Sequence, residues 1–88
     1  MNVQFRSSFA KDLRAIKDKG LLKRVKEAIE QVEKAPSLQA LTNIKRLKGG
    51  GNYYRIRIGD YRLGIVVEGD VATFVRCLDR KQIYRYFP

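Results

Sequence analysis

The segment YYRIRIGDYRLGIVV, Tyr53 to Val67, decides how the rest of the chain can be interpreted. Apolar and basic residues alternate along it, and Gly59 and Asp60 interrupt the alternation near its middle. Because side chains of a β-strand point to opposite faces of a sheet with a period of two, such alternation is typical of a half-buried strand. The segment therefore predicts two antiparallel strands joined by a two-residue hairpin loop.

A loop of this length fixes the register of the predicted hairpin. The opposed pairs are Ile58 with Tyr61, Arg57 with Arg62, Ile56 with Leu63, and Arg55 with Gly64. The apolar residues then share one face, while the arginines gather on the other. Like charges directly opposite one another destabilise a strand pair. Folding gives no reason for this arrangement, so the pattern indicates a place where an anion docks.

The length and charge of the chain limit its class. Its 88 residues predict one domain spanning 1–88, and a hydrophobic share of 44% is ordinary for a globular protein. There are 19 basic and 9 acidic residues, and the resulting net charge of +10 attracts polyanions. The part from 44 to 88, which holds the hairpin, is the more basic one.

Several functional classes are excluded by residue types alone. Histidine is absent, which rules out histidine acid–base catalysis, histidine metal sites and Ser-His triads in this chain. Cys77 is the one cysteine, so no intrachain disulfide can form, and we expect it to be a small apolar side chain in a strand. Charged residues interrupt the start of the chain, and no apolar run approaches the ~20 residues of a membrane span. We therefore expect a cytoplasmic protein without membrane association.

The first twenty residues predict a short strand and an amphipathic helix. Val3 and Phe5 alternate with polar residues, as in a strand. The helix is expected to begin at a cap formed by Ser7 or Ser8 and to end at Gly20. Its apolar stripe consists of Phe9, Leu13 and Ile16.

A second amphipathic helix is predicted from about Leu21 to Ala35, stopped by Pro36. Its apolar stripe consists of Leu22, Val25, Ala28 or Ile29, and Val32. Each helix can use its stripe to cover a sheet. The alternative is that the pair binds a membrane surface or a partner.

A linker is expected between the second helix and the hairpin. A short helical turn fits residues 37–47, where the apolar positions recur at every third residue. The sequence KRLKGGG then runs from Lys45 to Gly51 as a lead-in to the hairpin. Its basic residues Lys45, Arg46 and Lys48 either extend the positive surface or belong to a solvated basic loop.

After the hairpin, Gly69 and Asp70 predict a second tight turn, followed by a strand from Val71 to Leu78. Arg76 has the same parity as the apolar residues of this strand, so it falls among core-facing positions near the sheet edge. The last stretch, LDRKQIYRYFP, interleaves aromatic and basic side chains, which can stack on bases while pairing with phosphates. The alternative is a C-terminal turn that packs Ile83 and Phe87 against the sheet, and the two interpretations are compatible.

The predicted fold class is α+β. Two N-terminal helices are expected to pack on one face of a mainly antiparallel sheet of about four strands. The side chains expected to be most buried are Leu13, Ile16, Val25, Ile29, Ile56, Leu63 and Ile65.

The motifs together resemble the RelE/ParE superfamily of toxins from type II toxin–antitoxin systems. The resemblance rests on the basic, glycine-rich lead-in, the motif Y-R-I-R-x-G-D-Y-R, a second glycine turn, a valine-rich strand and the terminal D-R-K-x-x-Y-R. It covers essentially the whole chain and is closest to RelE-like messenger RNA interferases. It implies a RelE-like fold, similar to that of microbial ribonucleases.

RelE-like toxins are small ribonucleases that enter the ribosomal A site and cut the messenger there. The resemblance carries their catalytic positions over to Arg55, Arg57, Arg62, Arg80 and Tyr84. Many relatives have histidine just before the last of these arginines, where this chain has Asp79, so one acid–base group of the family is missing here.

The resemblance implies cleavage without a metal or cofactor, by attack of the 2′-hydroxyl on the adjacent phosphorus. The three hairpin arginines would hold the phosphate and stabilise its developing charge. Tyr84 would be the general base, and Arg80 would assist the leaving 5′-oxygen. The expected RNA-binding residues are Lys45, Arg46, Lys48, Tyr53, Lys81 and Arg85.

Two alternatives belong to other functional classes. ParE-like relatives share the fold but poison DNA gyrase without a catalytic set, although the basic positions and Tyr84 speak against that role here. A non-catalytic RNA-binding module is the second alternative. The resemblance also implies partners, namely a cognate antitoxin, the ribosome with its A-site messenger, and operator DNA contacted through the antitoxin.

Overall fold

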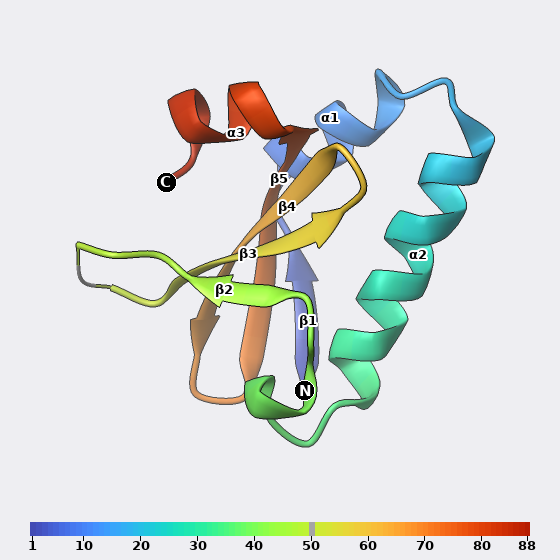
Figure 1. Ribbon diagram of the computed structural model, residues 1–88. Coiled ribbons are helices and arrows are strands. Elements are labelled where there is room, and N and C mark those ends of the chain that lie inside the picture. The colour runs from blue at the N-terminus through green and yellow to red at the C-terminus, as the bar shows by residue number, and fades with distance from the viewer. Residues whose placement is uncertain (50) are drawn as a thin grey trace.

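The computed structural model describes residues 1–49 and 51–88, so Gly50 in the predicted lead-in lies outside the described residues. A five-stranded sheet has the order β1-β5-β4-β3-β2, in which β1 and β5 are parallel and the other neighbours are antiparallel. The elements in chain order are β1 (Asn2–Phe5), α1 (Ser7–Arg14), α2 (Lys19–Lys34), η1 (Leu38–Ala40), β2 (Ile44–Arg46), β3 (Tyr53–Ile58), β4 (Tyr61–Glu68), β5 (Val71–Asp79) and α3 (Arg80–Tyr86) (Figure 1).

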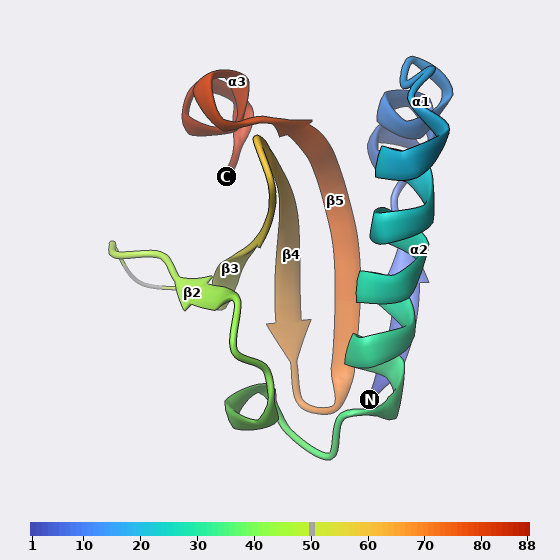
Figure 2. The same ribbon diagram turned by 45° about the vertical axis from the view of Figure 1, so that its right-hand side comes forward.

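The predicted α+β class and the placement of the helices are confirmed. Figure 2 shows α1 and α2 along one face of the sheet and α3 at the other face. The predicted number of strands, about four, is one too low, because β2 forms inside the expected linker. At the C-terminus, the helix α3 forms where a turn was the alternative. In the part of the chain that the structure describes, no helix is long and apolar enough to cross a membrane.

The hairpin has the predicted register. Ile58 pairs with Tyr61, and Arg57 pairs with Arg62, on either side of the two-residue loop. Gly59 has φ +57°, a left-handed conformation that glycine adopts without steric cost at the first central position of such a loop. Ile56 is buried, so the core face of the hairpin is the expected one.

The boundary between the two N-terminal helices differs from the prediction. The N-cap residue of α1 is Arg6, without a side-chain hydrogen bond, and Ser8 Oγ instead donates to the backbone oxygen of Val75 at 2.6 Å. Gly20 lies inside α2 rather than at the end of α1. The reason is Asp18, whose carboxylate accepts from the backbone N–H of Leu21 at 3.1 Å and so caps α2.

The core forms where both helices meet the centre of the sheet. Of the side chains expected to be most buried, four are 2% exposed or less, namely Val25, Ile56, Leu63 and Ile65. Leu13, Ile16 and Ile29 are only half-buried, because they pack at the border of the core rather than at its centre. Phe9, Phe74 and Ile83 are buried in addition.

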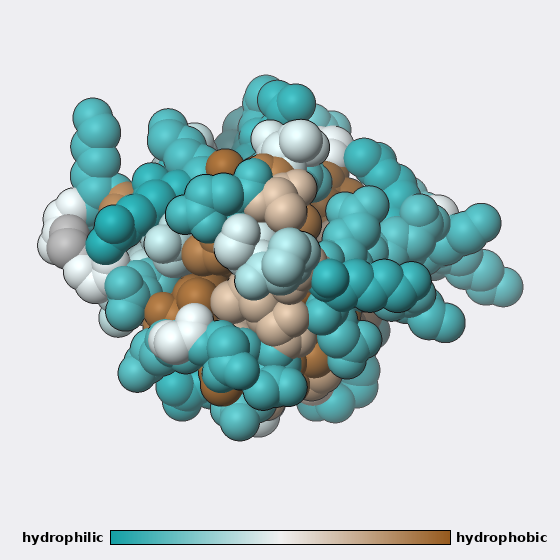
Figure 3. Space-filling model, turned by 90° about the horizontal axis from the view of Figure 1, so that it is seen from below, coloured by the Kyte–Doolittle hydropathy of each residue, from teal (hydrophilic) through white to brown (hydrophobic). Residues whose placement is uncertain are grey.

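Apolar surface also shows between hydrophilic side chains at the end of the molecule that holds the N-terminus and η1 (Figure 3).

An irregularity in β5 corrects the expected position of Arg76. Gly64 pairs with Arg76 whereas Ile65 pairs with Phe74, so Val75 is an extra residue in the ladder. The extra residue reverses the parity, and Cys77 rather than Arg76 faces the core. Cys77 is therefore the buried strand residue that was predicted, and burial, helped by the nearby Asp12 carboxylate, raises the pKa of its thiol to about 12.

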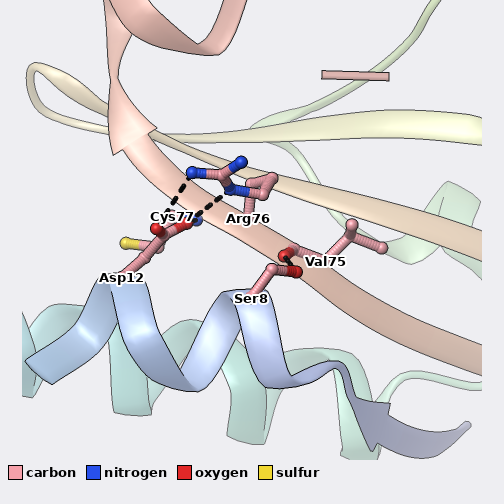
Figure 4. A network of polar contacts seen from close by, with 5 residues as sticks. All are labelled: Ser8, Asp12, Val75, Arg76 and Cys77. Carbon is pink, nitrogen blue, oxygen red and sulfur yellow. Dashed lines mark hydrogen bonds and ion pairs between the residues drawn. The ribbon is translucent and has the colours of Figure 1, made fainter. Parts of the chain in front are cut away.

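Helix α1 supplies the partners of β5 beyond the end of β1 (Figure 4). The backbone N–H of Cys77 donates to Asp12 Oδ2 at 2.9 Å, and Arg76 Nε donates to the same oxygen at 2.8 Å. Arg76 Nη2 donates to Asp12 Oδ1 at 3.1 Å. The helix thus satisfies backbone groups at a sheet edge that would otherwise lie open.

Candidate functional site

The predicted arginines surround a hollow of about 420 Å³ on the sheet face opposite α1 and α2. We call it the arginine hollow. Its lining comes from the segment leading into β2, from β3 and β4, and from α3, and consists of Thr42, Asn43, Ile44, Lys45, Arg55, Arg57, Arg62 and Tyr84.

The register of three strands brings the cations of this hollow together. Lys45 on β2 is opposite Arg55 on β3, and Arg57 on β3 is opposite Arg62 on β4. Because alternate residues of a strand share a face, the four side chains form a contiguous basic surface. β2, which was expected to be linker, is what adds Lys45 to the three predicted arginines.

The charges of the hollow are not neutralised within the described residues. There the one ion pair joins Arg76 to Asp12, and no carboxylate lines the hollow. Arg62 is held by backbone oxygens rather than by a carboxylate, since its Nη1 donates to the oxygens of Gly59 at 2.8 Å and Tyr61 at 2.9 Å. The structure thus holds several cations in close array without an internal anion, which is an arrangement suited to a bound phosphate.

Tyr84 closes the hollow from α3. The Cζ atom of Arg55 lies 4.3 Å from the centroid of its ring, a cation–π contact that joins the helix to β3. The tyrosine is 69% exposed, so its ring is accessible to a ligand. A phenol oxygen beside a cluster of guanidinium groups can accept or donate a proton next to a bound phosphate.

The other predicted catalytic residue, Arg80, lies at the start of α3 and does not line the hollow. Its backbone N–H donates to the oxygen of Asp60 at 2.8 Å, which ties the helix to the hairpin loop, and its side chain is exposed. The preceding Asp79 caps α3 by accepting from the backbone N–H groups of Lys81 at 3.0 Å and Gln82 at 2.9 Å. Asp79, the residue that departs from the pattern of the family, therefore stabilises the start of α3.

The predicted RNA-binding residues are dispersed. Only Lys45 lines the arginine hollow, whereas Arg46 is opposite Tyr54, on the other parity of β2, and donates from Nη2 to the backbone oxygen of Gly51 at 3.2 Å. Tyr53 packs edge-on against Phe87, with ring centroids 5.8 Å apart. The remaining three are exposed, namely Lys48 beside β2 and Lys81 and Arg85 on α3.

Two features of the site were not predicted from the sequence, namely β2 with Asn43 before it, and the helix α3. Asn43 holds the C-terminal end of β3, because its Nδ2 donates to the backbone oxygen of Arg57 at 3.1 Å and its own backbone oxygen accepts from the N–H of Arg57 at 3.0 Å. No periodic signal precedes β2. Helix α3 did have a signal, since Asp79 followed three residues later by Gln82 resembles a capping box.

Among the described residues, no three metal-ligating carboxylates or thiols gather in a group.

The comparisons with known proteins agree on one family. A family model described as the ParE toxin of the type II toxin–antitoxin system parDE matches residues 3–84. Toxin RelE3 of Methanocaldococcus jannaschii is 48% identical over 89 residues, which cover 100% of both chains. A crystal structure of a RelB–RelE antitoxin–toxin complex from Methanococcus jannaschii matches with a TM-score of 0.81 and 46% identity, covering 97% of this chain and 99% of that one.

A second archaeal RelE–RelB complex, from Pyrococcus horikoshii OT3, matches with a TM-score of 0.73 and 25% identity, covering 90% of this chain and 93% of that one. The likeness therefore extends over the elements that form the arginine hollow as well as over the helices.

Proposed function

Since this chain belongs to the RelE/ParE superfamily of toxins from type II toxin–antitoxin systems, we propose that it is a ribosome-dependent endoribonuclease. Its substrate is messenger RNA in the ribosomal A site, and the outcome of cleavage is arrest of translation. The observation that carries the proposal is the arginine hollow, where four cations and one tyrosine meet without a carboxylate.

The reaction needs no group outside the RNA and the protein. The 2′-oxygen attacks the adjacent phosphorus, the new O2′–P bond forms, and the P–O5′ bond breaks. One proton leaves the 2′-hydroxyl and one reaches the departing 5′-oxygen. Because negative charge accumulates on the phosphate oxygens during this step, fixed cationic donors stabilise the transition state more than the ground state.

The residues divide this work by position. Arg55, Arg57 and Arg62 hold the phosphate, with Lys45 beside them, and Tyr84 takes the proton of the 2′-hydroxyl. Arg80 precedes Tyr84 by four residues, so the two lie on the same side of α3, from which Arg80 serves the leaving oxygen. Such a site has no strong base, which suits an enzyme whose substrate is positioned by the ribosome.

A cognate antitoxin is part of the same proposal. Two of the structures that this chain resembles are complexes of RelE with RelB. An acidic segment that covers the arginine hollow would neutralise it, and the net charge of +10 would speed the encounter. Operator DNA is then contacted through the antitoxin.

The test is cleavage mapping by primer extension in a reconstituted translation system. The parent chain should produce messenger ends inside the A-site codon of stalled ribosomes and leave the same RNA intact when ribosomes are omitted. Lys23→Ala, which removes an exposed charge from α2 on the other face, should cleave like the parent. Absence of cleavage with ribosomes present contradicts the proposal.

The second candidate is poisoning of DNA gyrase, which the match to the ParE family model favours. Under this function, DNA breaks should form only when gyrase is present, and the messenger should remain uncut. Incubating the chain with gyrase and supercoiled plasmid distinguishes the two functions directly.

A further inference from the structure

A second hollow, of about 430 Å³, lies beside the first one on the same face of the sheet. We call it the aromatic hollow. Phe87, Val66 and Val75 contribute apolar surface to it, and Tyr53 and Tyr86 contribute aromatic rings. Arg6 and Ser7, from the junction between β1 and α1, add a cation and a hydroxyl.

The linings of the two hollows have β3 and α3 in common. Tyr53 and Arg55 are two residues apart on β3 and so point to the same face, about 6.6 Å apart along the strand. Tyr84 and Tyr86 are two residues apart on α3, which places them on different sides of that helix. Both hollows are thus lined by β3, which contributes Arg55 and Arg57 to the first and Tyr53 to the second, and each receives one tyrosine from α3.

The aromatic rings are held in defined positions. Tyr53 meets Phe87 nearly at a right angle, with an interplanar angle of 83°. Tyr86 remains 52% exposed, and the guanidinium of Arg76 lies 5.8 Å from its ring centroid. Arg76 is itself fixed by Asp12, so an accessible ring is presented by an ordered support.

We propose that the aromatic hollow binds the base of a nucleotide adjacent to the phosphate held in the arginine hollow. Tyrosine rings stack on any base, because every base has a π-face, and a cation nearby suits the connecting phosphate. Tyr53 and Arg55, which line one hollow each, are about 6.6 Å apart along β3, a spacing comparable to that of successive nucleotides in an extended strand. This inference rests on the proposed function, since it takes the same RNA strand as the ligand.

A double-mutant cycle between protein and RNA tests the proposal. The probe is a short single-stranded RNA with one 2′-deoxynucleotide at the cleavage position, so that it cannot be cut, labelled for fluorescence anisotropy at low salt. Matched RNAs carry an abasic nucleotide on the 5′ or the 3′ side of that position. The proteins are the parent, Tyr86→Ala, Tyr86→Phe and the control Gln82→Ala, an exposed residue of α3 that lines neither hollow.

With the intact RNA, Tyr86→Ala should weaken binding about tenfold, the usual effect of removing a stacking ring, whereas Tyr86→Phe and Gln82→Ala should bind like the parent. With one of the two abasic RNAs the effect of Tyr86→Ala should vanish, because the base that the ring contacts is gone. A shift of α3 caused by the substitution would instead weaken binding of all three RNAs equally.

Fluorescence gives an independent readout. The chain has no tryptophan, so Tyr86→Trp introduces a single indole that stacking of a base should quench. Equal losses with all RNAs, no quenching, or no RNA binding by the parent overturn the proposal. Cleavage of messenger by the same preparation on programmed ribosomes then shows that the proposed function stands without this subsite.

Discussion

The ring of Phe87 lies directly on Gly64 of β4. A Cβ atom at Gly64 would be 2.6 Å from Cγ of Phe87, closer than such atoms approach in proteins. The absence of a side chain at this one strand position therefore lets the end of the chain pack onto the sheet. Since Tyr84 and Tyr86 precede Phe87 on the same segment, this contact helps to place both hollows.

Gly64→Ala should accordingly lower the free energy of unfolding by about 1–3 kcal/mol, the usual cost of overpacking. Urea denaturation measures it. In a Phe87→Leu background, whose smaller side chain can move aside, the same substitution should cost much less. An equal cost in both backgrounds would mean that the two residues do not compete for this space.

Arg57→Ala and Arg62→Ala should each reduce ribosome-dependent cleavage about a hundredfold or more, because each removes donors from the place where phosphate charge develops. The two variants should differ in stability. Arg57 is exposed, so its loss should leave the melting temperature nearly unchanged, whereas Arg62 also holds the backbone oxygens of Gly59 and Tyr61. Cleavage at the parent rate by folded Arg57→Ala would remove that residue from the site.

Tyr84→Phe separates proton transfer from packing. The variant keeps the ring beneath Arg55 and therefore the cation–π contact, but lacks the phenol oxygen. It should bind ribosomes like the parent and cut far more slowly in single-turnover measurements, without rescue at higher pH. If Tyr84→Phe cuts at the parent rate and Tyr84→Ala does not, the ring serves for stacking and another group takes the proton.

Cys77 makes stability depend on pH above neutrality. Burial raises its pKa from the ordinary value of 9.0 to about 12, so between these values the unfolded chain loses a proton that the native state keeps. The native state then binds more protons, and stability falls as pH rises, by about 1.4 kcal/mol per pH unit from this group. The stability advantage of the parent over Cys77→Ala should therefore shrink between pH 9 and pH 11. A constant difference would mean that the thiol titrates alike in both states.

Binding of the antitoxin should weaken as salt increases, because screening reduces attraction between exposed charges once the Debye length falls below about 10 Å. Calorimetric titrations at several chloride concentrations measure the effect. An affinity that is the same at low and high salt would indicate apolar docking on the helices instead.

The parts of the structure that the sequence predicts are those where local chemistry leaves one choice. In the hairpin, a two-residue loop and strict alternation determine every pair from Arg55 to Gly64. The break between the helices was less determined, because Asp18 as an N-cap and Gly20 as a C-cap compete within three residues.

The irregularity at Val75 could not be predicted from its own strand. Its position depends on where β1 ends, on the hydrogen bond that Ser8 donates to β5, and on those that Asp12 accepts from β5, over separations of 64 to 67 residues in sequence. The site shows the same division. Alternation predicts that the hairpin arginines share a face, but only the docking of α3 determines that Tyr84 lines the hollow while Arg80 does not.

The pairing of β1 with β5 joins strands from opposite ends of the chain, and it bears on how this protein is made. A nascent chain that has not yet released residues 71–88 from the ribosome has neither the neighbour of β1 nor the helix that carries Tyr84. The surface proposed to attack ribosomes is thus completed only when synthesis of this stretch has finished. Fragments from interrupted synthesis should be harmless to the cell that produces them.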